Sequence, residues 1–420
     1  MKFSHIADVH IGSWRDPKMK ILAEESFIKA IDISIQEKVD FLLIAGDLFN
    51  TAIPGIDQIK LAIKKLQELK EKNIPVYYIA GSHDYSPSGK TMLDIIEEAK
   101  LGINVTKGKI NEQGKLQLQF TEDPKTGAKI TGLIGRRGML ERKYYEALDT
   151  TNLEQENGFK IFMFHTSIDE LKPKELQEME SNPISFLPKG FDYYAGGHVH
   201  IVAEYNEQNL TKKTEAQNTD NQNSKPRYQN VIYPGPTFPA NFSELEKLNT
   251  GGFYIYDEGK LERKTLKIKE TIIEKVLIEN ENPEQATTKI KNSLKNQDVQ
   301  NKIILLRIEG QLSTGTTDQI EMKEIIQELY QKGAYFVMKN TNKLKTQEFK
   351  EIKIEEHHQE QIENKLIKEH LNQTENDFQD EEKLTKTLIQ VLSQEKNEAE
   401  KQSDYEKRIQ KDIDQTLESQ

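Results

Sequence analysis

The sequence predicts an α/β fold in which helices cover layers of β-sheet. Four apolar runs have the length of buried strands and stop at a glycine or a histidine: residues 39–45, 74–80, 161–164 and 191–195. Apolar residues at helical spacing fill the intervals before the first two runs, over residues 21–35 and 59–69. Strands and helices that alternate at this distance indicate βαβ units packed into a layered sandwich.

The remaining elements of this unit follow in order along the chain. Residues 3–7 alternate in polarity and predict the first strand. Residues 206–230 are rich in Asn, Gln, Thr and Lys, which predicts a long polar loop. Ordered structure resumes at residue 231, and residues 253–256 predict a strand that turns at Gly259 into a partner strand.

A second, smaller α+β unit is predicted after residue 270. Its pattern gives strands at 272–278, 303–308 and 334–338, with helices at 284–294 and 318–331. We therefore predict three domains, which comprise residues 1–270, 271–345 and 346–420.

The last 75 residues predict charged helices with narrow apolar stripes. The stripes are Ile362, Leu366, Ile367 and Leu371; Leu384, Leu388, Val391 and Leu392; and Tyr405, Ile409, Ile413 and Leu417. Stripes of this width cannot form a core alone and favour docking onto a partner. The alternative is a helical hairpin that folds on itself.

Composition excludes several classes of site. The 420 residues include no cysteine, so disulfides, thiolate metal sites and cysteine nucleophiles are excluded. We expect neither a signal peptide in residues 1–20 nor a membrane span, because no apolar run approaches about 20 residues. The net charge is −11, but residues 346–420 hold 20 acidic and 11 basic side chains. The rest of the chain is therefore close to neutral and can present local basic patches to nucleic acid.

Acidic and imidazole side chains follow the ends of the predicted strands. The series is Asp8 and His10, Asp47, His83, His165, and His198 and His200. Ligands of α/β sheets bind beyond the carboxyl ends of strands, so these side chains are expected to converge. Carboxylates and imidazoles suit divalent ions, and two ions about 3.5–4 Å apart can clamp a phosphate. The alternative, polar loop residues placed by coincidence, is disfavoured by five matches in order.

This series resembles the signature of the calcineurin-like metallophosphoesterases, in which Asp-x-His, Gly-Asp, Gly-Asn-His-Asp/Glu, His and Gly-His-x-His occur in this order. The segments 46–49 (GDLF) and 233–237 (YPGPT) more narrowly resemble the DNA double-strand-break nucleases of the meiotic recombination eleven (Mre-eleven) or SbcD family, above all archaeal members. The resemblance covers about residues 1–270, loosely the small module, and the tail in position and helical character only. It implies a four-layer sandwich of two mixed β-sheets flanked by helices, with a small α+β cap and a helical C-terminal region.

Carried over by position, the resemblance implies a ligand set for two Mn²⁺ ions. Asp8, His10, Asp47 and His200 would hold one ion, and Asp47, His165 and His198 the other. His83 matches the family histidine that contacts the scissile phosphate and assists the leaving group, so it is expected to be catalytic and not a ligand.

Two positions depart from the family pattern. Ser82 replaces the asparagine that ligates the second ion, and a hydroxyl is a shorter and poorer ligand. A turn or capping role for Ser82 is equally compatible with the sequence. Asn50 stands where relatives often carry histidine, near the substrate.

Arg136 and Arg137 are candidate phosphate contacts, although basic pairs are also common on any surface.

The resemblance implies a metal-dependent DNA exonuclease and endonuclease that processes double-strand breaks. The implied partners are DNA ends, single- and double-stranded, and an SMC-like coiled-coil ATPase (Rad-fifty or SbcC type) bound through residues 346–420. A homodimer is expected, with residues 56–72 and 92–100 as the candidate interface, although their apolar positions could equally face the sheet. With the ATPase it would form a heterotetramer in the cytoplasm at the nucleoid. The alternatives are a small-molecule or cyclic-nucleotide phosphodiesterase of the same fold and a scaffold subunit with an impaired second metal site.

Overall fold

The computed structural model describes residues 1–86, 91–173, 176, 178–207, 227–346, 381–394 and 402–418. The chain forms two compact units. The first comprises residues 1–274, 297–306 and 326–340, and the second comprises 275–296, 307–325 and 341–420. Most of the predicted polar loop, residues 208–226, lies outside the described residues.

Six strands form the first sheet, in the order β14-β13-β1-β2-β3-β4. Their bounds are β1 Lys2–Ile6, β2 Phe41–Ala45, β3 Val76–Ile79, β4 Ile103–Asn104, β13 Gly251–Asp257 and β14 Lys260–Leu266. Strands β1 to β4 are parallel, and β13 runs antiparallel to β1. The carboxyl ends of β1, β2 and β3 therefore share one edge of the sheet.

Six further strands form the second sheet, in the order β11-β12-β10-β9-β8-β7. Their bounds are β7 Thr121–Glu122, β8 Lys129–Gly132, β9 Lys160–His165, β10 Tyr193–Gly197, β11 Val202–Tyr205 and β12 Val231–Pro234. The four central strands are parallel, and the edge strands β7 and β11 are antiparallel. Both sheets are thus mixed, as the sequence resemblance implies.

The two sheets pack face to face through a fully buried aromatic layer. The ring of Phe3 in β1 stacks on Phe41 in β2 at 4.9 Å and meets Tyr193 of β10 edge-on at 5.0 Å. Such pairs add to the free energy gained by removing large apolar surfaces from water. The core between the sheets fixes their separation, and with it the distance between the loops at their common edge.

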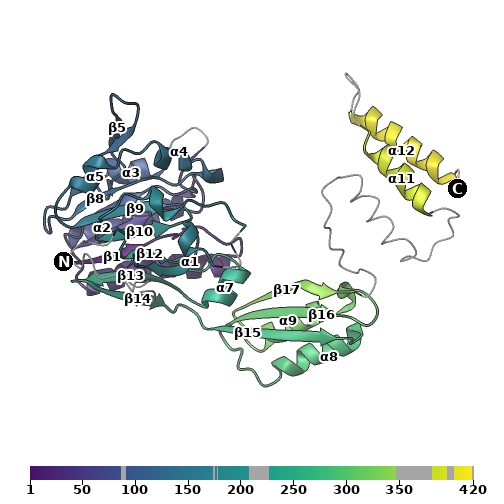
Figure 1. Ribbon diagram of the computed structural model, residues 1–420. Coiled ribbons are helices and arrows are strands. Elements are labelled where there is room, and N and C mark those ends of the chain that lie inside the picture. The colour runs from purple at the N-terminus through teal and green to yellow at the C-terminus, as the bar shows by residue number, and fades with distance from the viewer. Residues whose placement is uncertain are drawn as a thin grey trace, which may run out of the picture. The chain divides into compact units, whose positions relative to one another are not determined.

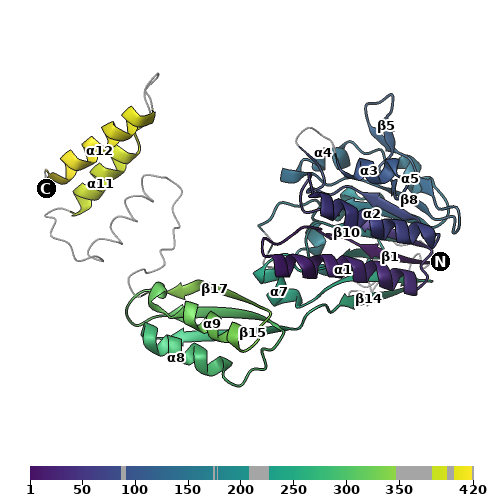
Figure 2. The same cartoon turned by 180° about the vertical axis from the view of Figure 1, so that it is seen from behind.

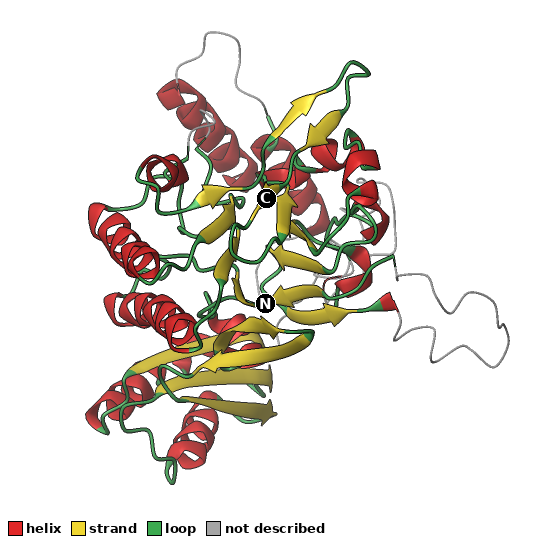
Figure 3. Cartoon of the chain, turned by 90° about the vertical axis from the view of Figure 1, so that its left-hand side faces the viewer, coloured by secondary structure: helices red, strands yellow, loops and turns green. Residues whose placement is uncertain are grey.

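Helices cover the outer face of each sheet (Figures 1 and 2). The long helices are α1 (Pro17–Gln36) and α2 (Ile56–Glu71), and the short ones are α3 (Leu93–Glu98), α4 (Arg142–Glu146), α5 (Thr151–Gln155) and α7 (Phe242–Leu248). Phe27 and Leu66 of the long helices pack with Leu42 of the first sheet. Tyr145 and Leu153 pack on Phe162 of the second sheet. Figure 3 shows these helices flanking the strands, which confirms the four-layer α/β sandwich.

The smaller α+β module contains a three-stranded sheet in the order β15-β16-β17. Its elements are β15 Thr271–Glu279, α8 Pro283–Leu294, β16 Ile303–Gln311, α9 Met322–Gln331 and β17 Phe336–Lys345. Helix α8 begins at a capping box, in which Asn282 and Gln285 each accept a hydrogen bond from the other's backbone N–H.

In the tail, helices α11 (Glu381–Leu392) and α12 (Gln402–Glu418) lie against each other (Figure 1). The Tyr405 hydroxyl donates to the Gln394 carbonyl at 2.9 Å, and Leu384 and Val391 are buried. These two helices thus form the hairpin considered as the alternative for the tail. Residues 347–380, with the first predicted stripe, lie outside the described part of the chain.

Short local elements were not predicted from the sequence. A two-stranded hairpin of β5 (Gly108–Ile110) and β6 (Leu116–Leu118) stands apart from both sheets, and Ile110 is 65% exposed. Short 3-10 turns occupy Arg137–Met139, Asp169–Leu171, Ile184–Phe186 and Thr317–Gln319. Across the described ranges, no helix has the length and apolar character needed to span a membrane.

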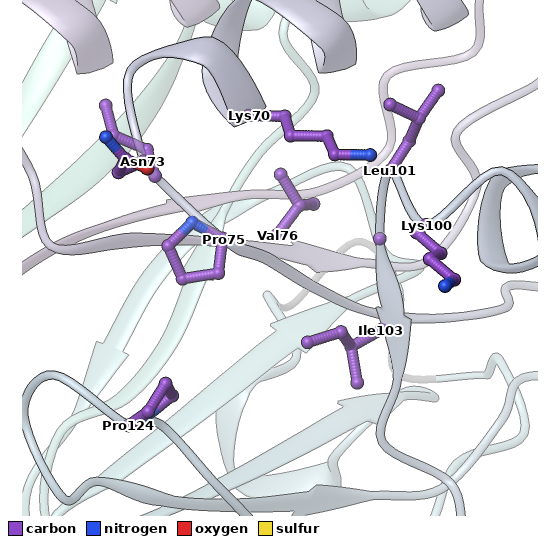
Figure 4. Close-up of a pocket in the computed structure, with 10 residues that line it drawn as sticks. Lys70, Asn73, Pro75, Val76, Lys100, Leu101, Ile103 and Pro124 are labelled. Carbon is purple, nitrogen blue, oxygen red and sulfur yellow. The ribbon is translucent and has the colours of Figure 1, made fainter.

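A cavity of about 320 Å³ opens at the start of β3 and β4. Figure 4 shows Lys70 and Lys100 beside the apolar Val76, Leu101 and Ile103. Because these residues precede or begin their strands, the cavity lies at the opposite end of the sheet from the predicted ligands. It is therefore separate from the chemistry predicted for the carboxyl ends.

Candidate metal centre

The predicted ligands meet where the parallel strands of both sheets end. Asp8 and Asp47 follow β1 and β2 of the first sheet, and His165 closes β9 of the second sheet. The sheets are joined here directly, because the His198 backbone N–H donates to the Asp8 carboxylate at 2.9 Å. Three overlapping groups of side chains bring one ligand atom each within 4.8 Å of the others: Asp8, His10 and His200; His10, Asp47 and His83; and Asp8, Asp47 and His165.

Most of these ligands have an unusual backbone. Positive φ angles occur at Asp8 (50°), His10 (48°), Asp47 (52°), His198 (101°) and His200 (52°). Left-handed backbone is uncommon in residues other than glycine and is concentrated at functional sites. Here it turns each side chain back toward the space between the two sheets.

His165 and Asp47 form the deepest pair. His165 Nδ1 lies 2.8 Å from the Ala45 carbonyl and must donate to it, while Nε2 lies 3.1 Å from Asp47 Oδ2. With a neutral ring, two acceptors would face each other, so a proton or a cation belongs between them. Burial alone would lower the pKa of His165, but the charge and hydrogen bond of Asp47 raise that pKa to about 10. The same contacts outweigh burial and hold the Asp47 pKa well below its usual range.

His10 and His200 form a second close pair, which meets through the two Nε2 atoms. Their Nε2 atoms are 2.9 Å apart, and His200 Nε2 is 3.7 Å from Asp8 Oδ1. Burial lowers the pKa of His10 to about 3, so this ring is neutral. Burial also acts on His200, but Asp8 and Glu244 raise its pKa to about 9. A cation that displaced the proton between the two rings could bind both Nε2 atoms.

His198 is in none of the three groups and lies beside His165. Its ring lies 5.1 Å from that of His165, centroid to centroid, and burial lowers its pKa to about 3. The buried Asp8 carboxylate, whose pKa burial raises, accepts the His198 backbone N–H through both oxygens. His198 is thus neutral, as a metal ligand must be.

His83 lies at the rim of the cluster and is held by two hydrogen bonds. Its backbone N–H donates to Asp47 Oδ1 at 2.7 Å, and its Nδ1 lies 2.8 Å from the carbonyl of Asn50. Nδ1 therefore carries the proton that binds Asn50, and Nε2 remains available to a substrate or an ion. Asn50 positions His83 through its backbone. His83 also lies in a group with His10 and Asp47 that could hold an ion, and its catalytic role stays a prediction.

Ser82 is buried beside the shared carboxylate. Its Oγ lies 3.5 Å from Asp47 Oδ2, the limit of a hydrogen bond. The hydroxyl thus lies near the ligand oxygens, and ligation by Ser82 stays a prediction. Arg137 Nε donates to the Ser82 carbonyl at 3.3 Å, and Arg136 lies over the Tyr85 ring at 5.0 Å. Both predicted arginines therefore flank the turn that carries His83.

Two carboxylates near the ligands were not assigned a role from the sequence. Asp84 accepts backbone N–H groups of Gly81 and Phe49 at 2.9 and 3.1 Å and so ties together the turns after β2 and β3. Glu244 lies 3.1 Å from His200 Nδ1. Asn241 followed by Glu244 is a recognisable helix start, which could have predicted α7. No local signal indicates that Glu244 reaches a histidine 44 residues away.

The donor set fits divalent metal ions. The cluster offers only carboxylate oxygen and imidazole nitrogen, which suit hard and borderline divalent ions such as Mn²⁺ and Zn²⁺. The independent structural argument is the spacing, because the ligand atoms within each of the three groups lie within 4.8 Å of one another, close enough to surround one ion. The centre can therefore hold metal ions and neutralise a phosphate brought to them.

Comparison with known proteins agrees with this geometry. Residues 1–202 match the family model of the calcineurin-like phosphoesterases. The chain is 28% identical over 316 residues to the DNA double-strand break repair protein Mre11 of Methanococcus maripaludis, covering 71% of this chain and 75% of the relative. It is 33% identical over 207 residues to the Mre11 protein of Sulfolobus acidocaldarius, covering 48% of this chain and 50% of the relative.

A third relative, the Mre11 protein of Sulfurisphaera tokodaii, is 32% identical over 207 residues, which is 47% of this chain and 48% of that protein. The chain thus spans about half the length of most of the curated relatives that it matches. The matched region contains every predicted ligand from Asp8 to His200. Residues 1–202 are thus similar in sequence to the calcineurin-like phosphoesterases, and the convergence of the strand-end side chains in a four-layer sandwich agrees with that similarity.

Proposed function

We propose that this protein is a metal-dependent DNA nuclease that hydrolyses phosphodiester bonds at double-strand breaks. The observation that carries the proposal is the convergence of buried carboxylates and imidazoles, with His165 against Asp47 and His10 against His200, at one edge of a sandwich that resembles the phosphoesterases. The names of the archaeal relatives support DNA as the substrate. We propose two Mn²⁺ ions per chain, held by the predicted ligands.

The residues divide into those that hold charge and those that face the substrate. Bound ions would supply an activated water molecule and positive charge to the phosphate. Asp47 lies between His10 and His165, at 3.7 and 3.1 Å, which suits a carboxylate shared by two ions. Since Nδ1 is engaged by Asn50, His83 would act through Nε2, which in the imidazolium form would donate its proton to the leaving oxygen. Arg136 and Arg137 would contact the DNA backbone near this turn.

Cleavage of DNA provides the test. We expect the full chain with Mn²⁺ to cut a labelled duplex, and His83→Ala to bind Mn²⁺ with wild-type stoichiometry while losing most cleavage. His5→Gln is a matched control, because His5 is a buried histidine whose Nδ1 lies 2.9 Å from the Tyr193 hydroxyl and which is in none of the three groups that could hold an ion. If the wild-type chain cleaves no DNA, alone or with its ATPase partner, the proposal is wrong. Cleavage of cyclic nucleotides but not of DNA would support the small-molecule alternative.

The scaffold alternative is motivated by Ser82 alone. Ser82 Oγ lies 3.5 Å from Asp47 Oδ2, a separation that two ligands of one ion can have, so the alternative is motivated by the weak donor strength of a hydroxyl and not by its position. A stoichiometry near one Mn²⁺ per chain would support an impaired second site. Ser82→Asn would then restore the second ion, since its longer amide carries an oxygen ligand.

We further propose that the protein works with an SMC-like coiled-coil ATPase and as a homodimer, on DNA in the cytoplasm. Two exposed isoleucines support the dimer face, Ile56 at 76% on α2 and Ile95 at 42% on α3. The described tail hairpin leaves Leu392 60% and Leu417 41% exposed, which supports an apolar docking surface. Deletion of residues 346–420 should abolish co-purification with the ATPase, and retained binding would refute the assignment of the tail.

A further inference from the structure

One carboxylate supports the ligand cluster from outside it. Glu244 Oε1 lies 3.1 Å from His200 Nδ1, and its side chain is 18% exposed. We infer that Glu244 is a positioning residue, which fixes the tautomer and the ring orientation of His200 so that Nε2 faces the metal ions. This inference rests on the proposed use of metal ions by this chain.

The direction of the hydrogen bond follows from the chemistry of the two groups. An ionised carboxylate only accepts, so His200 Nδ1 must donate to Glu244. The neutral ring then carries its lone pair on Nε2. That atom is the one that lies among the ligands, 2.9 Å from His10 Nε2 and 3.7 Å from Asp8 Oδ1. Glu244 therefore selects the tautomer that a metal ion requires.

The carboxylate is itself held in place by its own turn of the chain. Glu244 Oε2 accepts the Ala240 backbone N–H at 2.7 Å, and Oε1 accepts the Asn241 side-chain amide at 2.6 Å. Asn241 in turn accepts the Glu244 backbone N–H at 3.0 Å as the N-cap of α7. Three donors on one carboxylate restrict its rotation. Its negative charge in the first turn of a helix is also favourable.

Helix α7 is anchored in a hydrophobic cluster. Phe242 and Leu245 are buried together with Met19 and Leu22 of α1 and with Ile303 of β16. Because one face of α7 is buried, Glu244 on the same short helix cannot shift without disturbing this cluster. The packing of α7 thus holds Glu244 in place, and Glu244 in turn holds the ring of His200.

A purely structural role for Glu244 predicts a different outcome from a positioning role. If Glu244 only stabilises α7, its loss lowers the stability of the fold and leaves Mn²⁺ affinity unchanged. If it orients His200, its loss weakens metal binding by about 10- to 100-fold, the usual effect of removing such a partner. Glu244→Gln retains one oxygen but turns an amide N–H toward a donor, so it should fall between wild type and Glu244→Ala.

The experiment uses the full chain in four variants beside wild type: Glu244→Ala, Glu244→Gln, Lys247→Ala and Glu258→Gln. Lys247→Ala is a control on the same helix, where Lys247 is exposed. Glu258→Gln is a control for the loss of a negative charge, because Glu258 lies in an exposed turn. Calorimetric titration with Mn²⁺ measures affinity, thermal unfolding without metal measures stability, and ¹⁵N spectra of the Zn²⁺-loaded protein report the His200 tautomer.

We expect Glu244→Ala to lose 10- to 100-fold in the affinity of one Mn²⁺ and to show mixed His200 tautomers, with both controls at wild-type affinity. Wild-type Mn²⁺ affinity in Glu244→Ala, or an equal loss in Lys247→Ala, would overturn the inference. The readouts are independent of cleavage. Wild-type protein that binds Mn²⁺ but cuts no DNA would refute the proposed function and leave this inference standing.

Discussion

Replacement of Gly46 by alanine tests whether the fold places His165 before any ion binds. Gly46 has φ +85°, and a Cβ built on it would lie 2.2 Å from His165 Nδ1. Gly259 has φ +90° in the turn between β13 and β14, and a Cβ there meets nothing within 4 Å. Both substitutions impose left-handed backbone on alanine, at about 1–2 kcal/mol. Only Gly46→Ala adds a collision with a predicted ligand.

The difference between the two variants isolates that collision. An ordinary contact between carbon and nitrogen is about 3.5 Å, so the His165 ring must move by roughly 1 Å or more. Overpacking of this kind costs about 1–3 kcal/mol, and loss of the hydrogen bond from His165 to Ala45 costs about 1 kcal/mol more. We therefore expect Gly46→Ala to be less stable than Gly259→Ala by about 2–4 kcal/mol.

The assay is urea unfolding of both variants without metal, in which the fluorescence of Trp14 reports the unfolded fraction. This is the single tryptophan of the chain, and its Nε1 donates to the Pro239 carbonyl at 3.0 Å. Titration with Mn²⁺ on the folded variants measures the ligand set. Equal unfolding free energies in Gly46→Ala and Gly259→Ala, together with equal Mn²⁺ affinity, would refute the argument that the fold presets His165.

Three further outcomes follow from the same contacts. Mn²⁺ affinity should rise between pH 6 and pH 9, by up to about tenfold per pH unit for each ion. The reason is that the pKa values of His165 and His200 are raised to about 10 and about 9, so both rings must lose a proton before they bind an ion. Calorimetry in buffers of different ionisation enthalpy measures the number of protons released. Without metal, the stability that protonated His165 contributes should be complete below pH 6.5 and lost as the pH rises through about 10, which unfolding midpoints measured across this range would show. Asp84→Asn should destabilise the protein by about 1–3 kcal/mol and lower cleavage, because an amide cannot accept all the backbone N–H groups that Asp84 accepts, whereas unchanged unfolding would contradict this role.

The sequence predicts the strands of this protein better than its short helices. The apolar runs that became β2, β3, β9 and β10 are long enough to stand out, and each is fully buried. Helices α4 and α5 have five residues each, which is too short for a helical period to be visible. Their burial comes from contacts with distant strands, which no local pattern encodes.

The candidate metal centre, too, could be predicted only in part from the sequence. Residue type and order predicted which side chains converge, because each follows a strand whose end is set by the sheet. Distances between them depend on the packing of two sheets, so the pairing of His10 with His200 across 190 residues could not be predicted. Glu244 was missed for the same reason, since its role depends on a contact and not on its neighbours in sequence.

The left-handed backbone of the ligands explains why their geometry is a property of the whole fold. Five ligand residues have positive φ, and each costs about 1 kcal/mol, a sum comparable with the net stability of a domain. Such residues persist only where other contacts hold them. The contacts are present: the His10 N–H donates to the Asp47 carbonyl at 3.0 Å, and the Asp8 N–H donates to the Gly46 carbonyl at 3.2 Å. Because folding already fixes these backbone conformations, little of the free energy of ion binding is lost to ordering the binding residues. The affinity for the ion is correspondingly higher.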